Sequence, residues 1–283
     1  MSFLLFATSF GLILDHVYAS EKIKRCPTEA HPRSDNGAYF FDGIRGWVMD
    51  WSTGEKPIWW NDPSAKPYTE EEKKAWAQKR RASEQKQKLE WAAAAKRADD
   101  LLKVCTQETH YYLNSKGLPN ALGLVAENVL VIPMRNWETN ALQGVQMIEW
   151  NNHEKCFDKK MNYGMRAKGA ILRLGTKTAK ETFLVEGYAT GLSVEIALRQ
   201  MRLIAAIAVC FSASNLEYVA DKLQGKKFVI ADNDKSKTGE NSAIKTGLPY
   251  TMSEVEGEDA NDLYQRAGVM ALCSLIMRLR QMA

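Results

Sequence analysis

Cysteine is sparse in this sequence, and no two cysteines form a C-x-x-C pair. The five cysteines are scattered over 283 residues, at positions Cys26, Cys105, Cys156, Cys210 and Cys273. An odd number with no regular spacing argues against a disulfide framework and fits reduced thiols in a cytoplasm. We therefore expect a cytoplasmic protein.

Long apolar runs are also missing. The opening segment MSFLLFATSFGLILDHVYAS is interrupted by Thr8 and Ser9 and carries Asp15 and His16. It is too short to span a bilayer, which takes about 20 apolar residues. It resembles a secretory signal in ending Val-Tyr-Ala-Ser, but it lacks a positively charged start. We expect a short amphipathic helix packed on the next segment, and no membrane partner.

Neither sign of charge dominates the whole chain, whose formal net charge is only +4. With 45% hydrophobic residues, the composition is that of a globular protein, and the length predicts two domains. Residues 151–180 are the exception, because they hold eight Lys or Arg against Glu154 and Asp158. Such a stretch suits a polyanionic ligand, although a lysine-rich surface loop would also explain it.

Residues 1–68 are rich in aromatic and turn residues and predict a small β module. AYFF and GWVMDW are typical of short strands, and Asn-Gly, Asp-Gly and Thr-Gly pairs mark turns between strands. Five of the eight tryptophans fall in or just after it, at Trp47, Trp51, Trp59, Trp60 and Trp76. They could stack on unpaired bases, but packing in a core is the commoner use of tryptophan.

Residues 69–104 predict one long linker helix. The stretch is rich in Ala, Glu, Lys and Arg and contains no Gly or Pro, and Thr69 with Glu72 forms a capping box at its start. At 1.5 Å per residue, the helix would be roughly 50 Å long. Its mixed charges indicate a solvated surface.

The remaining chain changes pattern near residue 181. Residues 105–180 contain a predicted β-hairpin, VLVIPMRNWETNALQGVQMIEW, and the basic stretch. From residue 181, four apolar strands alternate with four helical segments, beginning with ETFLVEG and ATGLSVEIALRQ. Alternation of this kind predicts an α/β fold with a parallel sheet.

Acidic residues follow two of these strands. Glu186 comes directly after the first, and Asp232 and Asp234 come after the third. The carboxyl ends of parallel strands share one edge of the sheet, where ligands bind. Carboxylates there suit Mg²⁺, which keeps waters that phosphate can displace. A Glu before Gly can also be a turn residue, and Asp-Asn-Asp can cap a helix. Their joint occurrence favours phosphate chemistry.

Three segments, VEGYATGLSV, IADNDKS and GEDANDLYQ, together resemble the Toprim domain of bacterial replicative primases and of type IA and II topoisomerases. The closest resemblance is to the primases of phages and mobile elements. The hairpin is similar to the strand-turn-strand that opens the primase RNA-polymerase domain, and FDKKMNYGMRAKGAILRLG resembles its basic loop. RCPTEAHPRSDNGAYFF lies where such primases carry a zinc ribbon.

The resemblance implies an architecture for nearly the whole chain. A Toprim core, a four-stranded parallel sheet flanked by helices, would occupy 181–283. The α+β subdomain at 105–180 would form the first part of the catalytic core. A linker helix at 69–104 and a degenerate, β-rich, zinc-ribbon-like module at 1–68 would precede it.

The resemblance also implies roles for individual residues. Glu186 would act as acid or base near the reacting 3′-hydroxyl, and Asp232 and Asp234 would hold Mg²⁺ or Mn²⁺. Asp259 would be a further metal ligand, but the family's second acid is Asn261 here, which weakens the second metal site. Four basic residues would contact nucleoside triphosphate or template, at Lys159, Lys160, Arg166 and Lys168.

The activity implied is that of a DNA primase, which makes short RNA primers on single-stranded DNA from ribonucleoside triphosphates in a bacterial host cytoplasm, with a replicative helicase as a partner. Zinc is not expected, because Cys26 and His31 supply at most two of the four ligands of a structural site. Two alternatives stay open: a catalytically weak nucleic-acid-binding accessory to a separate helicase, and a metal-dependent Toprim nuclease.

Overall fold

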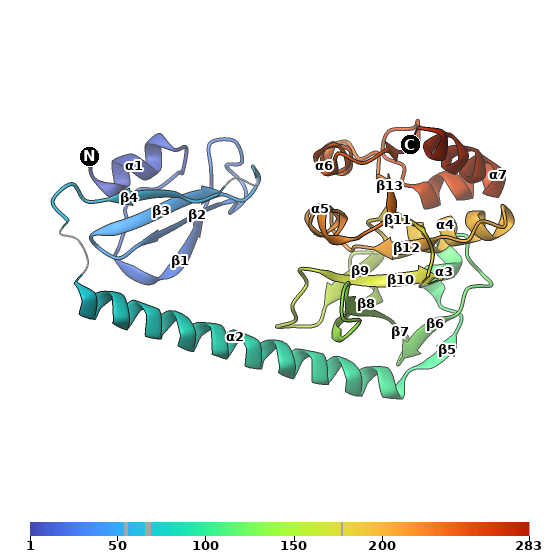
Figure 1. The fold of residues 1–283 in the computed structure, drawn as a ribbon, viewed down its shortest axis with the longest axis horizontal. Helices are drawn as coiled ribbons and strands as arrows, with labels where there is room; N and C mark the ends of the chain where they lie inside the picture. The colour runs from blue at the N-terminus through green and yellow to red at the C-terminus, as the bar shows by residue number, and fades with distance from the viewer. Residues whose placement is uncertain (54–55, 66–68, 177, 283) are drawn as a thin grey trace. The chain divides into compact units, whose positions relative to one another are not determined.

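The computed structural model describes residues 1–53, 56–65, 69–176 and 178–282. The chain divides into two compact units, Met1–Arg81 and Ala82–Ala283 (Figure 1). Three features predicted from the sequence fall on residues that are not among those described. They are the domain boundary at residue 68, the second residue of the Thr-Gly turn at 53–54, and the basic residue 177.

The first unit is a small antiparallel sheet with one short helix on it, as the turn-rich sequence predicts. The helix α1 spans Phe3–Ser9, and the sheet order is β1-β2-β3-β4. The strands are β1 (Ser20–Cys26), β2 (Gly37–Phe41), β3 (Arg45–Asp50) and β4 (Ile58–Asn61).

The core of this unit is aromatic. The ring of Phe3 stacks on Phe41 at 4.6 Å between centroids and meets Trp60 edge-on at 5.5 Å. Gly46 makes room for this packing, since a Cβ there would lie 2.4 Å from Phe3 Cε2. The amphipathic helix expected from the opening segment is therefore present, and it covers one face of the sheet.

Helix α2 spans Glu70–Val104, close to the predicted limits, and the division between the two units falls inside it. The predicted capping box is confirmed: Glu72 N donates to Thr69 Oγ1 at 3.2 Å, and Thr69 N donates to Glu72 Oε2 at 2.8 Å. Its last turns pack on the second unit, where Asn162 Nδ2 donates to Ala94 O at 3.0 Å. Most of the helix is exposed, in agreement with a solvated surface.

The second unit is built on one mixed sheet of ten strands. Its main path runs β14-β13-β11-β12-β10-β7-β6-β5, and β8 and β9 extend it from β7. Its strands are β5 (Thr106–Glu108), β6 (Gly123–Ala126), β7 (Val129–Asn136), β8 (Leu142–Asn151), β9 (Cys156–Met161), β10 (Ala170–Gly175), β11 (Glu181–Val185), β12 (Ala206–Val209), β13 (Lys226–Ile230) and β14 (Tyr250–Thr251).

The four strands expected to be parallel are parallel, in the order β14-β13-β11-β12. Two helices cover each face of this part of the sheet (Figure 1). On one face lie α4 (Tyr188–Gln200) and α7 (Ala260–Gln281); on the other lie α5 (Ala213–Lys222) and α6 (Thr238–Thr246). Helix α3 (Tyr111–Ser115) packs beside the first face.

One expectation about this unit is only partly right. The basic stretch was expected as a loop, and Arg166 and Lys168 do lie in one. Lys159 and Lys160 instead belong to β9, which pairs with β8 along its whole length. Residues 170–175 form β10, which is antiparallel to β12 and joins the hairpin strands to the parallel strands. The two expected subdomains, 105–180 and 181–283, therefore share one sheet.

Among the helices of the described ranges, none combines the length and the apolar character that a bilayer crossing requires.

Candidate acidic site at the sheet edge

The acidic residues predicted from the sequence lie at one edge of the parallel strands. Strand β11 ends at Val185 and Glu186 follows, while β13 ends at Ile230 and Asp232 follows two residues later. The two strands are parallel neighbours, with Leu184 opposite Val229. Their carboxyl ends therefore present the acids side by side, where ligands of such sheets bind.

Asp232 is the most perturbed of these acids. One of its oxygens, Oδ1, is closed off from solvent and has no hydrogen-bond partner. The pKa of Asp232 is raised to about 7, chiefly by burial and then by the charges of Asp259, Glu186 and Asp234, while the charge of Lys159 opposes the rise. A buried carboxylate without a partner is costly, so this position is one that a cation would stabilise.

Asp234 is held in a different way. Its Oδ2 accepts from Gly239 N at 2.8 Å, and its Oδ1 accepts from Thr238 N at 3.1 Å and from Ser236 Oγ. Burial raises the pKa of Asp234, but these hydrogen bonds outweigh burial and leave the pKa below its usual value. The carboxylate therefore stays ionised and also fixes the loop before α6, as the helix-capping explanation predicts.

The loop between Asp232 and α6 depends on Gly239. A Cβ at this position would lie 2.4 Å from Asp232 O and 3.1 Å from Asp232 N. Because backbone atoms cannot yield as a flexible side chain can, any other residue would push α6 away from the acidic site.

Glu186 lies half-buried between β11 and the start of α4, whose N-cap is Gly187. Its carbonyl accepts from Phe211 N at 2.9 Å, which fixes the backbone at the strand end. Burial raises the pKa of Glu186, as does the charge of Asp234, whereas Lys159 lowers it. A carboxylate with a raised pKa accepts a proton more readily than an unperturbed one.

Asp259 caps helix α7. Its Oδ1 accepts from Asn261 N at 2.7 Å and from Asp262 N at 2.9 Å, which completes a capping box with Asp262. Its charge nevertheless reaches Asp232. Asp259 therefore belongs to the acidic group, although one of its oxygens is engaged by the helix.

Asn261 is fully buried. It occupies the position at which the resemblance to primases implies a second acidic residue. Its Nδ2 donates to Lys116 O at 2.8 Å and to Ser193 Oγ at 2.9 Å, and its Oδ1 accepts from Gln265. These bonds join α7 to α4 and to the end of α3. Asn261 is a structural residue and does not face the site as a ligand.

The four predicted basic residues lie in different places. Lys159 Nζ lies 5.3 Å from the ring centre of Tyr112, and its charge reaches Glu186 and Asp232. Lys160, the next residue along β9, pairs with Asp158 at 2.9 Å and Glu149 at 3.7 Å. The cation of Arg166 lies over Trp91 at 5.1 Å, and that of Lys168 over Tyr218 at 4.6 Å. Only Lys159 contributes to the acidic group.

Tyr112, whose ring lies under the ammonium group of Lys159, was not predicted from the sequence as a site residue. Burial raises the pKa of Tyr112 to about 12, so its hydroxyl stays neutral. His110 fixes it in place: Nδ1 accepts from Tyr112 N at 3.1 Å, and Nε2 lies 2.9 Å from Asn128 O. The only signal in the sequence was the His-Tyr-Tyr run before a short helix.

The acids fit a divalent cation that keeps part of its water shell. Within the described ranges, no three His, Cys, Asp or Glu side chains lie close enough to share one metal ion. Mg²⁺ is usually held by one or two carboxylates together with waters and substrate phosphates. The unpartnered Oδ1 of Asp232, with Glu186, Asp234 and Asp259 around it, meets that requirement.

No family model matches the chain, and no curated protein is significantly similar to it. Among solved structures, the chain is similar to one described as the DnaG catalytic core, with a TM-score of 0.39 and 13% sequence identity. The match covers 71% of this chain and 73% of that one. A likeness of this size assigns neither a family nor an activity to the chain.

Proposed function

We propose that this protein is a Toprim-type, primase-like nucleotidyltransferase, which joins ribonucleotides into short primers on single-stranded DNA and releases pyrophosphate. The observation that carries the proposal is Asp232, a buried carboxylate with an unpartnered oxygen, surrounded by three further acids at a ligand-binding sheet edge. An arrangement of this kind destabilises the metal-free protein and is stabilised by a cation.

The residues at the sheet edge would have different roles, which follow from their different environments. Asp232 and Asp234 would hold Mg²⁺ or Mn²⁺, and Asp259 would act as a further ligand through an intervening water or after a shift of its side chain, since no three of the described acids lie close enough to share one ion. When bound, the cation would supply positive charge that stabilises the oxygens of an in-line phosphoryl transfer. Glu186, with its raised pKa, would accept the proton of the attacking 3′-hydroxyl. Lys159, held over Tyr112, would bind a phosphate of the nucleotide.

The first unit would contact the template. Trp47 lies opposite Trp59 on neighbouring strands, and 64% of Trp59 is exposed. The guanidinium of Arg25 lies over Trp51 at 5.4 Å. Exposed aromatic side chains next to cations suit unpaired bases and their phosphates. A replicative helicase is the partner that such a primase would serve.

The test is a gel of labelled products from single-stranded DNA, ribonucleoside triphosphates and Mg²⁺ or Mn²⁺. Wild-type protein should make oligoribonucleotides, and Asp234→Asn should abolish synthesis while DNA binding stays, because removing negative charge does not weaken a polyanion complex. Asp221→Asn is the matched control, since Asp221 is exposed and pairs with Lys222. Synthesis by Asp234→Asn at the wild-type rate would reject the proposal, and cleavage fragments would identify a nuclease instead.

A second function, a catalytically weak nucleic-acid-binding accessory, is favoured by Asn261. This residue replaces an acid by a neutral side chain whose hydrogen bonds are all internal. A site with fewer carboxylates would bind its cation less tightly. A shifted band without any product on the same gel would support this alternative.

A further inference from the structure

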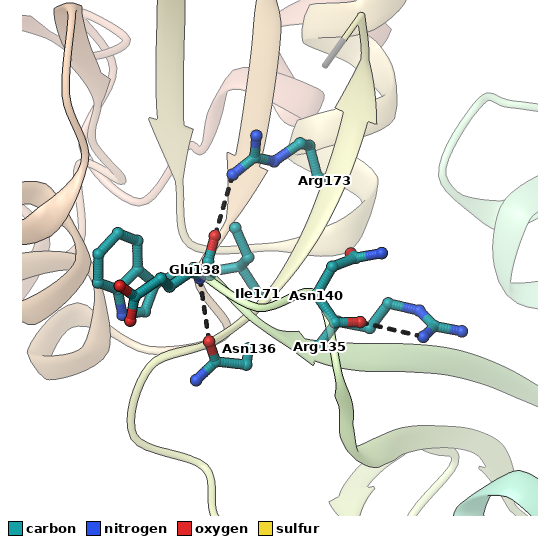
Figure 2. A pocket seen from close by; sticks show the side chains of 7 residues that line it. Arg135, Asn136, Glu138, Asn140, Ile171 and Arg173 are labelled. Carbon is teal, nitrogen blue, oxygen red and sulfur yellow. Dashed lines mark hydrogen bonds between the residues drawn. The ribbon is translucent and has the colours of Figure 1, made fainter.

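A cavity of about 170 Å³ lies beside the turn between β7 and β8, apart from the acidic residues (Figure 2). Its lining joins the turn to strand β10 and comprises Arg135, Asn136, Trp137, Glu138, Asn140, Ile171 and Arg173. Two arginines therefore border one small cavity, with their guanidinium groups on different sides of the turn (Figure 2).

The turn that forms one wall is built rigidly. Asn136 Oδ1 accepts from Glu138 N at 3.0 Å and from Thr139 N at 2.8 Å. Asn140 adopts a positive φ of 60°, which Asn tolerates better than most residues. The wall is therefore held by its own hydrogen bonds and does not need a ligand to form.

Both arginines are held by main-chain oxygens of this turn, as the dashed lines in Figure 2 show. Arg173 Nη2 donates to Trp137 O at 3.2 Å, and Arg135 Nη1 donates to Asn140 O at 3.3 Å. Neither forms an ion pair with a described carboxylate, although Glu138 lines the same cavity. Each guanidinium carries five N–H donors, so each keeps donors and its full charge for an anion.

An aromatic surface adjoins the cavity. The rings of Trp137 and Tyr218 both lie close to Gly169. A Cβ at this position would lie 3.2 Å from Trp137 Cδ1 and 3.2 Å from Tyr218 Cε1. Trp137 N also donates to Gly169 O at 3.0 Å. Lys168 lies over the ring of Tyr218. Cations and partly exposed aromatic rings thus occur together beside the cavity, a combination that binds phosphates and bases of nucleotides.

The cavity belongs to the same edge of the sheet as the acids. Strand β10 is antiparallel to β12, so its start lies beside the carboxyl end of β12, with Leu172 opposite Val209. Asn215 fixes this junction by donating to Ala170 O and Cys210 O, both at 2.8 Å. A nucleic-acid strand at the acidic site could therefore continue across this surface.

We propose that Arg135 and Arg173 form a second nucleotide-binding surface, or subsite, in which each guanidinium contacts a phosphate group and a base stacks on Trp137. The phosphate could belong to a polynucleotide or to a free nucleotide, and the chemistry of recognition is the same. The choice of a nucleotide as ligand rests on the proposed function, but the subsite is separate from the acidic residues.

The test measures binding without divalent cations, using fluorescence anisotropy of a labelled oligothymidylate at several salt concentrations. The double variant Arg135→Gln/Arg173→Gln keeps a side-chain amide for the turn but loses both charges. We expect weaker binding and a log-log salt slope smaller by about 1.4, since each of the two phosphate contacts contributes about 0.7 on a single strand. Arg199→Gln, which removes an exposed arginine paired with Glu195, is the control and should bind normally.

Stacking is tested separately on Trp137. Trp137→Ala should weaken binding about tenfold, and Trp137→Phe should restore most of it, because any aromatic face can stack. Thermal unfolding of each variant shows whether the fold is kept. Trp137 also packs partly against the hydrophobic core, so a loss of binding that occurs only together with a loss of stability would reject the stacking role.

Competition by unlabelled ATP distinguishes the two sources of the phosphate. Loss of oligonucleotide binding alone in the double Gln variant assigns the subsite to a strand, and loss of ATP binding alone assigns it to a free nucleotide. Unchanged binding of both probes overturns the inference. The binding test is independent of the primer-synthesis gel. If the double Gln variant binds both probes normally and the gel shows synthesis that depends on Asp234, only the subsite is rejected. Weakened binding by a protein that never makes primers rejects only the proposed function.

Discussion

The two units expose different parts of a β-sheet. In Met1–Arg81, a helix covers one face of an antiparallel sheet, and tryptophans stand on the other face. In Ala82–Ala283, helices cover both faces of the parallel strands, and acids collect at the strand ends. The first unit therefore offers a surface for stacking, whereas the second offers a sheet edge lined by acidic side chains.

The largest expected effect is at that edge. Replacing Asp232 by Asn should abolish primer synthesis and yet stabilise the metal-free protein at alkaline pH, because it removes a buried charge. Unfolding followed in EDTA at pH 8 should show a gain, whose upper limit from a pKa of about 7 instead of 3.8 is about 4 kcal/mol.

The pH dependence of this gain has a definite sign. The folded pKa of Asp232 is raised, so the unfolded chain ionises first, and wild-type stability falls as pH rises from about 4 to about 7. The gain from Asn should therefore be full above pH 7 and vanish below pH 4. An equal gain at both ends of this range would show that charge is not its cause.

The second effect distinguishes the two faces of the first unit. Trp60 is 9% exposed in the core with Phe3, so Trp60→Ala should cost about 3 to 5 kcal/mol. Trp59→Ala, on an exposed side chain, should cost far less. Trp47, half-buried on the same face as Trp59, should be intermediate. Thermal unfolding followed by tryptophan fluorescence gives the order, and equal losses for Trp59 and Trp60 would contradict it.

A third effect separates neighbouring lysines on β9. Lys159→Ala should weaken single-strand or nucleotide binding and reduce the log-log salt slope by about 0.7. Lys160→Ala should change little, because Lys160 pairs with Asp158 and Glu149. Anisotropy at several salt concentrations measures both. Equal slopes for the two variants would show that strand alternation does not select between them.

The smallest effect concerns zinc in the first unit. Purified protein should contain far less than one zinc per chain, and a chelator should leave this unit folded. Burial raises the pKa of the Cys26 thiol to about 11, which disfavours the thiolate that zinc requires. Cys26→Ala should therefore destabilise only by about 1 kcal/mol, as an ordinary buried substitution does. Stoichiometric zinc, lost together with the fold in this variant, would refute the expectation.

Local patterns predicted much of this structure. The parallel strands, the long helix and its Thr69 cap all follow from periodicity and capping signals, and the strand ends place Glu186 next to Asp232. Long-range pairing could not be predicted. The pairing of β9 with β8 turns Lys160 away from Lys159, and the junction at β10 brings Arg173 to the same cavity as Arg135. Burial of Asn261 depends on α3 and α4, which are distant in sequence.

Asn261 also restricts how this site could change over evolutionary time. An aspartate there would place a carboxylate oxygen against Lys116 O, which now accepts a hydrogen bond from the amide, and would bury a charge that no cation compensates, even with Gln265 still donating to its other oxygen. A richer acidic site is therefore out of reach by that single substitution. The groups around Asn261 would have to change first, so the order of mutations, and not only their number, decides which variants of this protein can be reached.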